Sequence, residues 1–184
     1  MWVNTMEKLW SQFLLDTEEL YKSYRLQHFS LKLMWSTYYD YKNENPQISN
    51  FKIFDKDLDE TVSFTEGNIE ESAEYGKYQE ILSATTVVMF YQLWDDYYRV
   101  AIAKRYSCSK NEINSDFFAE LNKVRRAIIQ NQFNPKECAG KLDILNFLIS
   151  ENKNFLLSSL EVSQIYNLIK KEIGRLKLEL SIAN

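Results

Sequence analysis

Glycine and proline are scarce along this chain, with four glycines and two prolines among 184 residues. Because these residues supply many of the turns in proteins, a chain with so few of them folds into a small number of long elements. The sequence is also 45% apolar and 15% aromatic, which argues against general disorder. These features predict a single all-α domain over residues 1–184, with a sizeable core.

Charge and cysteine usage narrow the class of protein. The formal net charge is −4, so the chain as a whole does not attract nucleic acid or an anionic membrane, and contact with RNA would require a local basic patch. Cys108 and Cys138 lie in no metal-type spacing, which predicts two reduced thiols. Neither a signal peptide nor an apolar run of membrane length is indicated. We therefore expect a cytoplasmic protein without membrane contact, cofactor or metal.

The periodicity of apolar residues predicts three segments along the chain. Residues 1–45 form N-terminal helices, residues 46–71 form a loop or hairpin insertion, and residues 72–180 form a helical core. The segment from Lys141 to Leu148 is compatible with either a helix or an extended strand. The predicted elements are helices at about Thr5–Ser30, Leu31–Lys42, Ser72–Tyr106, Asp116–Asn131 and Ser159–Leu180, and strands at Asn50–Phe54 and Thr61–Thr65.

The insertion contains a partial calcium-loop pattern. Asp55, Asp57, Asp59 and Glu66 fall at positions one, three, five and twelve of such a loop. Position six requires glycine for a sharp turn, but Glu60 stands there. We therefore interpret the segment as a solvated acidic loop and expect no calcium binding tighter than the millimolar range.

The stretch from Ser115 to Asn131 combines a clear helix with an unusual pair of cations. Ser115 is a good N-cap, and an apolar stripe follows at helical spacing. Arg125 and Arg126 are adjacent near the end of this largely apolar helix. The structural alternative to a binding site is that one arginine is solvated and the other pairs with a carboxylate. The stripe consists of Phe117, Leu121, Val124 and Ile128.

The only histidine, His28, lies near the end of the first predicted helix. A histidine at such a place is usually a surface residue or a partner of the helix dipole. We expect this structural role, although His28 could supply proton transfer if the first helix brought it to a site.

Several short motifs occur in an order that resembles the HEPN superfamily, in particular its small stand-alone members from prokaryotic defence and toxin–antitoxin loci. The resemblance covers roughly Trp94 to Leu180. The motifs are Trp94–Arg99 (WDDYYR), Ile102–Lys104, Asn111–Ile113, Ser115–Phe117, Glu120–Leu121, Arg125–Asn131, Lys141–Leu142 and a capped helix that starts at Ser158.

The resemblance implies an all-α HEPN-like helical bundle that forms a homodimer. Many members are metal-independent endoribonucleases, and their motif is an arginine, a polar residue and a histidine about five positions after the arginine. Arg125 matches the arginine, whereas Arg126 replaces the polar residue and Gln130 replaces the histidine. Because a glutamine amide does not titrate near neutrality, it cannot act as general acid or base. Arg125, Arg126 and Asn131 would remain able to bind RNA.

Three hypotheses follow for the function. The first is a catalytically impaired HEPN-like dimer that acts through RNA or protein binding, with a cognate antitoxin or defence protein as partner. The second is an active HEPN endoribonuclease with an altered site. The third is a helical protein-interaction module without a nucleic-acid role. Absence of RNA binding at low salt would favour the third hypothesis.

Overall fold

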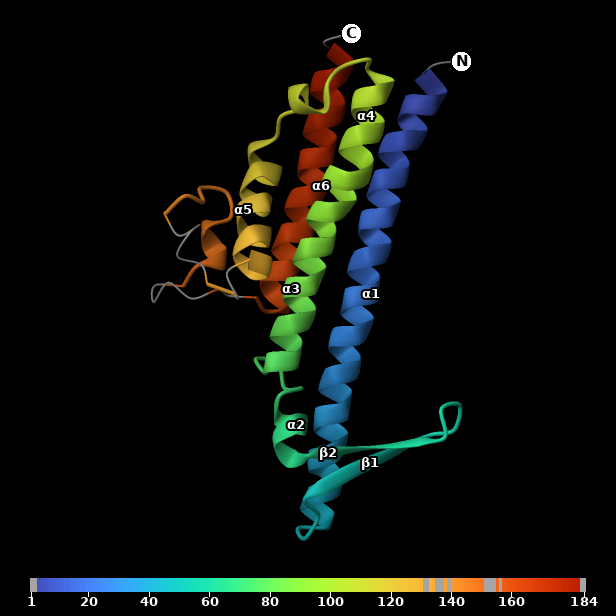
Figure 1. The fold of residues 1–184 in the computed structure, drawn as a ribbon, viewed down its shortest axis with the longest axis vertical. Helices are drawn as coiled ribbons and strands as arrows, with labels where there is room; N and C mark the ends of the chain where they lie inside the picture. The colour runs from blue at the N-terminus through green and yellow to red at the C-terminus, as the bar shows by residue number, and fades with distance from the viewer. Residues whose placement is uncertain are drawn as a thin grey trace. The chain divides into compact units, whose positions relative to one another are not determined.

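The computed structural model describes residues 3–130, 133–134, 138, 140–150, 155 and 157–182. Over these residues the chain is mainly helical, and its two regular strands form one antiparallel hairpin (Figure 1). The helices are α1 (Val3–Glu44), α2 (Glu66–Glu70), α3 (Lys77–Gln92), α4 (Arg99–Arg105), α5 (Asp116–Gln130) and α6 (Ser159–Ile182), and the strands are β1 (Asn50–Asp55) and β2 (Glu60–Thr65).

The prediction of an all-α fold with a small hairpin insertion is confirmed, but the first helix differs from the prediction. α1 continues without interruption through Ser30 and Leu31, where a break between two helices was expected. The Ser30 hydroxyl donates to the carbonyl of Leu26 at 2.8 Å, so it bonds back within the helix and does not cap a new one. No glycine or proline lies in α1 to stop it.

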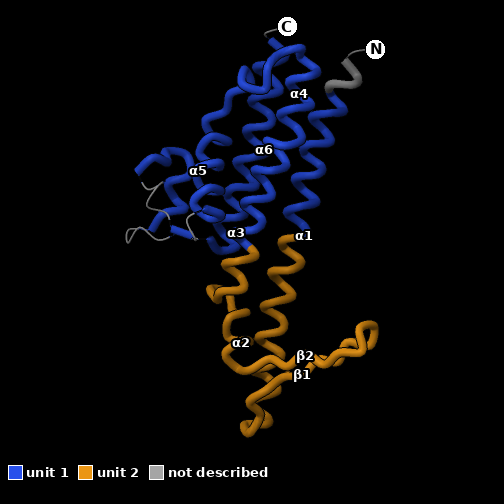
Figure 2. Tube along the Cα trace, in the orientation of Figure 1, with its two compact units in different colours: residues 1–23, 83–184 blue, residues 24–82 orange. Residues whose placement is uncertain are grey.

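The chain divides into two compact units (Figure 2). One unit contains residues 1–23 and 83–184, and the other contains residues 24–82.

The larger unit is built around stacked aromatic rings from four helical segments. Phe13 of α1 stacks on Tyr98 with ring centroids 4.3 Å apart, and Trp94 stacks on Phe118 of α5 at 4.3 Å. All four side chains are buried. From α6, Tyr166 stacks on Tyr21 of α1 at 4.1 Å. The dense aromatics of the sequence therefore fill much of this core.

A π-helical turn from Leu93 to Tyr98 joins α3 to α4 in the larger unit. Its closing bond runs from the backbone N–H of Arg99 to the carbonyl of Trp94, five residues earlier. The sequence predicted an unbroken α-helix across this turn, because a single π-turn cannot be recognised from the spacing of apolar residues. Such turns are rare and occur frequently at functional sites.

The smaller unit contains the β1–β2 hairpin, α2 and parts of α1 and α3. The predicted start of the third helix at Ser72 is too early, since α3 begins at Lys77. Gly76 makes the preceding turn possible, because a Cβ at this position would lie 2.4 Å from the carbonyl oxygen of Glu71.

His28 also lies in the smaller unit, and its expected surface position is wrong. The side chain is buried in the middle of α1, with Nδ1 2.7 Å from Oε1 of Gln79. Burial lowers the pKa of His28, and this outweighs the opposite effect of the Gln79 hydrogen bond. The continuous α1 explains the difference, because it removes the helix end near which the histidine was expected to sit.

Candidate functional site

α5 forms as its sequence predicts, and it carries the two arginines. Its N-cap residue Ser115 accepts a hydrogen bond from the backbone N–H of Phe118 at 3.1 Å. The same hydroxyl donates to Oε1 of Glu172 on α6 at 2.5 Å, which links the start of α5 to α6. The predicted apolar stripe is buried, and its members are Phe117, Leu121, Val124 and Ile128.

Glu120 is a buried charged residue of α5, and it holds the segment that follows the helix. Its carboxylate accepts three backbone N–H bonds, from Asp143 at 2.8 Å, Ile144 at 2.9 Å and Leu145 at 2.9 Å. The segment from Lys141 to Leu148 is therefore neither a regular helix nor a strand, apart from a short 3-10 turn at Asn146–Leu148. Glu120 fixes this loop against α5.

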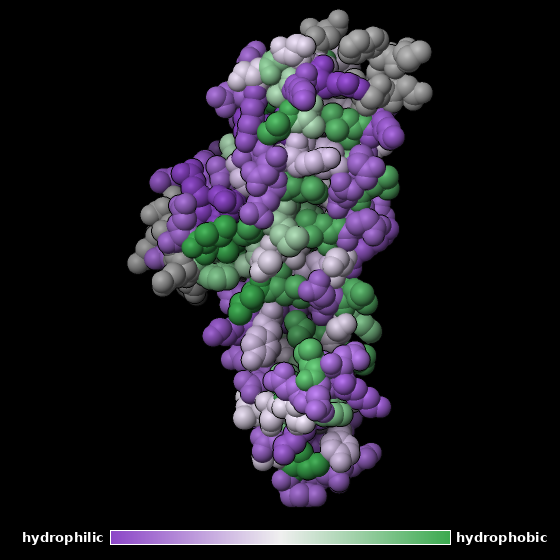
Figure 3. Space-filling model, turned by 45° about the vertical axis from the view of Figure 1, so that its right-hand side comes forward, coloured by the Kyte–Doolittle hydropathy of each residue, from purple (hydrophilic) through white to green (hydrophobic). Residues whose placement is uncertain are grey.

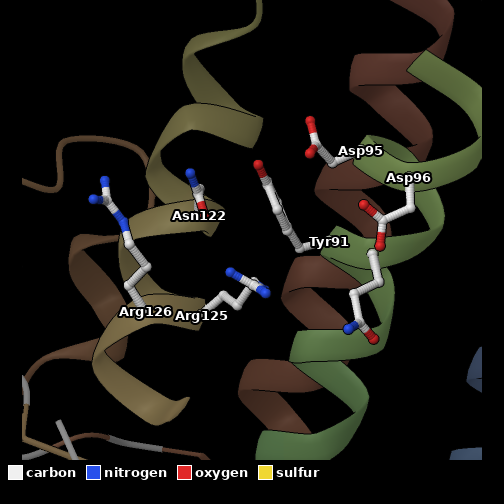
Figure 4. Close-up of a pocket in the computed structure, with 7 residues that line it drawn as sticks. Tyr91, Asp95, Asp96, Asn122, Arg125 and Arg126 are labelled. Atoms are coloured by element: carbon white, nitrogen blue, oxygen red, sulfur yellow. The ribbon is translucent and has the colours of Figure 1, made fainter. Parts of the chain in front are cut away.

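Arg125 and Arg126 point in different directions from α5 (Figure 4). Arg125 reaches toward α3, and its guanidinium carbon lies 5.6 Å from the ring centroid of Tyr91. The distance suits a cation–π contact. Arg126 is exposed and points away from α3. The sequence-based alternative, in which one arginine pairs with a carboxylate, does not apply among the described residues, where neither arginine has an ion pair.

Arg125 has a polar atom without a partner. Its Nε is buried and makes no hydrogen bond in the part of the chain that the structure describes. A buried donor without an acceptor costs about 1–3 kcal/mol, so this position favours a bound acceptor. The guanidinium lines a cavity of about 320 Å³, which has the size of small ligand sites.

The wall of this cavity opposite α5 belongs to α3 and the π-turn. The lining residues are Tyr91, Gln92, Asp95, Asp96, Asn122, Arg125 and Arg126. Sequence reasoning missed Tyr91, Gln92, Asp95, Asp96 and Asn122 as site residues, although Asp95 and Asp96 belong to one of the motifs of the family resemblance. A usable signal was the spacing of four between Tyr91, Asp95 and Arg99, which places polar groups along one face of an otherwise apolar helix.

Two basic residues hold Asp95 in place. Nη1 of Arg99 lies 3.1 Å from one carboxylate oxygen, and Nζ of Lys110 lies 2.9 Å from the other. Burial acts to raise the pKa of Asp95, but the hydrogen bonds from Lys110 and Arg99 outweigh it and lower the pKa. Burial also raises the pKa of the Tyr91 hydroxyl.

The charges of the lining residues are balanced. Arg125 and Arg126 carry two positive charges, and Asp95 and Asp96 carry two negative charges. Because Asp95 already pairs with Arg99 and Lys110, which lie outside the lining, its carboxylate does not neutralise the two arginines, and both guanidinium groups remain available to an anion.

The remaining predicted site residues do not line this cavity. Gln130 is the last residue of α5, is exposed, and is absent from the lining. Asn131 lies outside the described residues. His28 belongs to the smaller unit, where it bonds to Gln79, and it is not a lining residue. The structure therefore brings Arg125 and Arg126 to one cavity and leaves the second motif position outside it.

The acidic loop of the insertion forms the turn of the β1–β2 hairpin. Oδ1 of Asp55 accepts the backbone N–H groups of Asp57 at 2.9 Å and Leu58 at 3.2 Å, as in an Asx-turn. The loop is flanked by strands, whereas a calcium loop of this pattern is flanked by helices. Over the described residues, no three or more His, Cys, Asp or Glu side chains gather in a way that could hold a metal ion.

Comparison with other proteins adds no further assignment. The sequence matches no family model, and the chain has no significant similarity to a curated protein or to a solved structure. Within the described ranges, none of the helices is both long enough and apolar enough to cross a bilayer.

Proposed function

We propose that this chain is a HEPN-like protein that binds RNA through the Arg125 cavity without cleaving it. In this proposal it acts as a homodimer in a prokaryotic defence or toxin–antitoxin system, where its partner is a cognate antitoxin or defence protein. The observation that carries the proposal is the position of Arg125, whose buried Nε has no hydrogen bond to any residue that the structure describes and whose guanidinium lines a polar cavity.

The groups in the cavity suit a ribonucleotide. A guanidinium can bind a phosphate through two parallel N–H bonds, and Arg126 adds a second positive charge nearby. The buried ring of Tyr91 holds the Arg125 guanidinium in place, and Asn122 offers an amide that both donates and accepts. The carboxylate of Asp96 can accept a hydrogen bond from the 2′-hydroxyl of RNA. DNA lacks this hydroxyl, so the contact would favour RNA.

The directions of the pKa shifts of the lining residues support binding of RNA rather than its cleavage. Metal-free cleavage of RNA needs a general base for the 2′-hydroxyl and a general acid for the leaving oxygen, and both work best with a pKa near neutrality. The two lining groups whose pKa values shift move away from neutrality, Asp95 downward and Tyr91 upward. No histidine is among the lining residues. Neither Asp95 nor Tyr91 is therefore tuned for proton transfer.

The experiment is a titration of labelled single-stranded RNA, followed by fluorescence anisotropy at several salt concentrations. We expect binding that weakens with salt, and each of Arg125→Gln and Arg126→Gln should lower the slope of log K against log[salt] by about 0.7. Lys171→Gln is the matched control, because Lys171 is exposed on α6 and lines no part of the cavity.

Arg125→Lys separates charge from geometry. Lysine keeps the positive charge but loses the planar guanidinium that faces Tyr91, so we expect weaker binding with a nearly unchanged salt slope. Absence of RNA binding at low salt would refute the proposal and favour a protein-interaction module. Light scattering that reports a monomer at micromolar concentration would refute the homodimer.

A further inference from the structure

A groove on the larger unit has no role in the proposed RNA site. It lies between the start of α1 and α4, measures about 590 Å³, and shares no lining residue with the Arg125 cavity. Its volume falls within the range of small-molecule sites in proteins. Figure 3 shows one face of the molecule, on which apolar side chains run along the middle with polar side chains on both sides.

The groove combines an apolar floor with a cationic rim. Leu9 and Ala101 are half-buried in it, while Lys8, Lys104 and Arg105 are exposed around it. The long stems of these basic side chains add further apolar surface below their charged ends. Gln12 completes the side that α1 contributes.

The three basic residues are not neutralised. Lys8, Lys104 and Arg105 make no ion pair within the described ranges, and no acidic residue lines the groove. Three like charges around one groove repel one another, so an anion placed among them would relieve this repulsion. An acidic ligand group is therefore favoured at this rim.

The apolar surface extends away from the cationic end. Tyr97 lies one helical turn before Ala101 and is 62% exposed, and Leu15 lies about one turn beyond Gln12 and is 52% exposed. Lys8 and Leu15 are seven residues apart on α1, a distance of about 10 Å along the helix. Asp16, the neighbour of Leu15 in the chain, accepts hydrogen bonds from Nε2 of Gln12 at 2.7 Å and from the hydroxyl of Tyr98, so its carboxylate is already bound within the protein. The groove thus presents positive charge at one end and exposed apolar side chains beyond the other.

We propose that this groove binds a long-chain carboxylate, with its anionic head at Lys8, Lys104 and Arg105 and its alkyl chain along Ala101 toward Leu15 and Tyr97. The positive charge at the rim favours an anionic head group, and the apolar floor favours an alkyl chain. The ligand is a free acid in solution rather than a lipid in a membrane surface.

The test is isothermal titration calorimetry with dodecanoate below its micelle concentration. We expect one site per chain, and hexanoate should bind more weakly, by roughly four-fold for each methylene that is no longer buried. Dodecyltrimethylammonium, which has the same chain length with a cationic head, should bind at least ten-fold more weakly than dodecanoate. Equal binding of the two amphiphiles would overturn the proposal.

Variants locate the site on this groove. Lys104→Gln combined with Arg105→Gln should weaken dodecanoate binding at least ten-fold, whereas Lys171→Gln should leave it unchanged. Ala101→Phe should block the chain, and circular dichroism checks that this variant folds. Unchanged affinity in the double variant would overturn the proposal, as would binding to phosphatidylglycerol vesicles without binding to free dodecanoate.

Discussion

Replacing Glu120 by glutamine should release the loop that follows α5. The carboxylate accepts three backbone N–H bonds, two of them on the same oxygen. A glutamine carbonyl can keep those two as neutral bonds, each weaker by about 1 kcal/mol. The amide NH₂ then faces the third N–H, whose loss of an acceptor costs about 1–3 kcal/mol. We expect Glu120→Gln to lower the free energy of unfolding by about 3–5 kcal/mol.

Urea denaturation measures this change, with the fluorescence of the buried Trp10 and Trp94 as the probe of the larger unit. The corresponding fall in Tm is roughly 10 °C for a chain of this length. Hydrogen exchange adds a local measurement, since the amides of Asp143, Ile144 and Leu145 should lose protection before the core does.

Glu60→Gln is the matched control for this experiment. Glu60 is exposed on β2 and makes no side-chain hydrogen bond within the described ranges, so its replacement should change the free energy of unfolding by less than about 0.5 kcal/mol. If Glu120→Gln changes stability no more than Glu60→Gln does, and the three amides keep their protection, the anchoring role of Glu120 is refuted.

Three further predictions follow from the site and the fold. The unmodified protein should not cleave RNA under conditions in which it binds RNA; cleavage that Arg125→Gln abolishes would contradict the proposal of binding without cleavage. Because burial lowers the pKa of His28, the unfolded chain takes up its proton more readily; stability should be full above about pH 6.5 and fall below it, and His28→Gln should flatten this part of a pH series of urea denaturations. Calorimetric titration should show no calcium binding tighter than millimolar at the Asp55 loop, and a micromolar site would prove this wrong.

Local signals of the sequence predicted much of the fold. Ser115 and Ser158 both sit immediately before a helix as expected, and the backbone N–H of Ser158 bonds to Glu161 at 2.9 Å, as a capping box requires. The hairpin was also predictable, because short β-rich runs flank a polar turn. These features depend on residues a few positions apart, which a sequence displays directly.

The features that sequence reasoning missed depend on tertiary contacts. Nothing near Glu120 in the sequence reveals that its carboxylate bonds to a loop more than twenty residues later. His28 is buried by a contact with Gln79, which is 51 residues away. In the candidate site, Arg125 was visible as an unusual cation on an apolar helix, but Tyr91 became part of the site only through the packing of α5 against α3.

The number of residues in the π-turn between α3 and α4 determines how the faces of these two helices are rotated relative to each other. A π-turn holds one residue more than the α-helix around it, and it shifts the residues on its two sides by about 100° relative to an uninterrupted α-helix. Loss of one residue between Leu93 and Tyr98 would remove that shift and turn Tyr91 relative to the buried Ile102. Deletion of Tyr97, which does not line the Arg125 cavity, would therefore rearrange the wall of this cavity without removing any of its side chains.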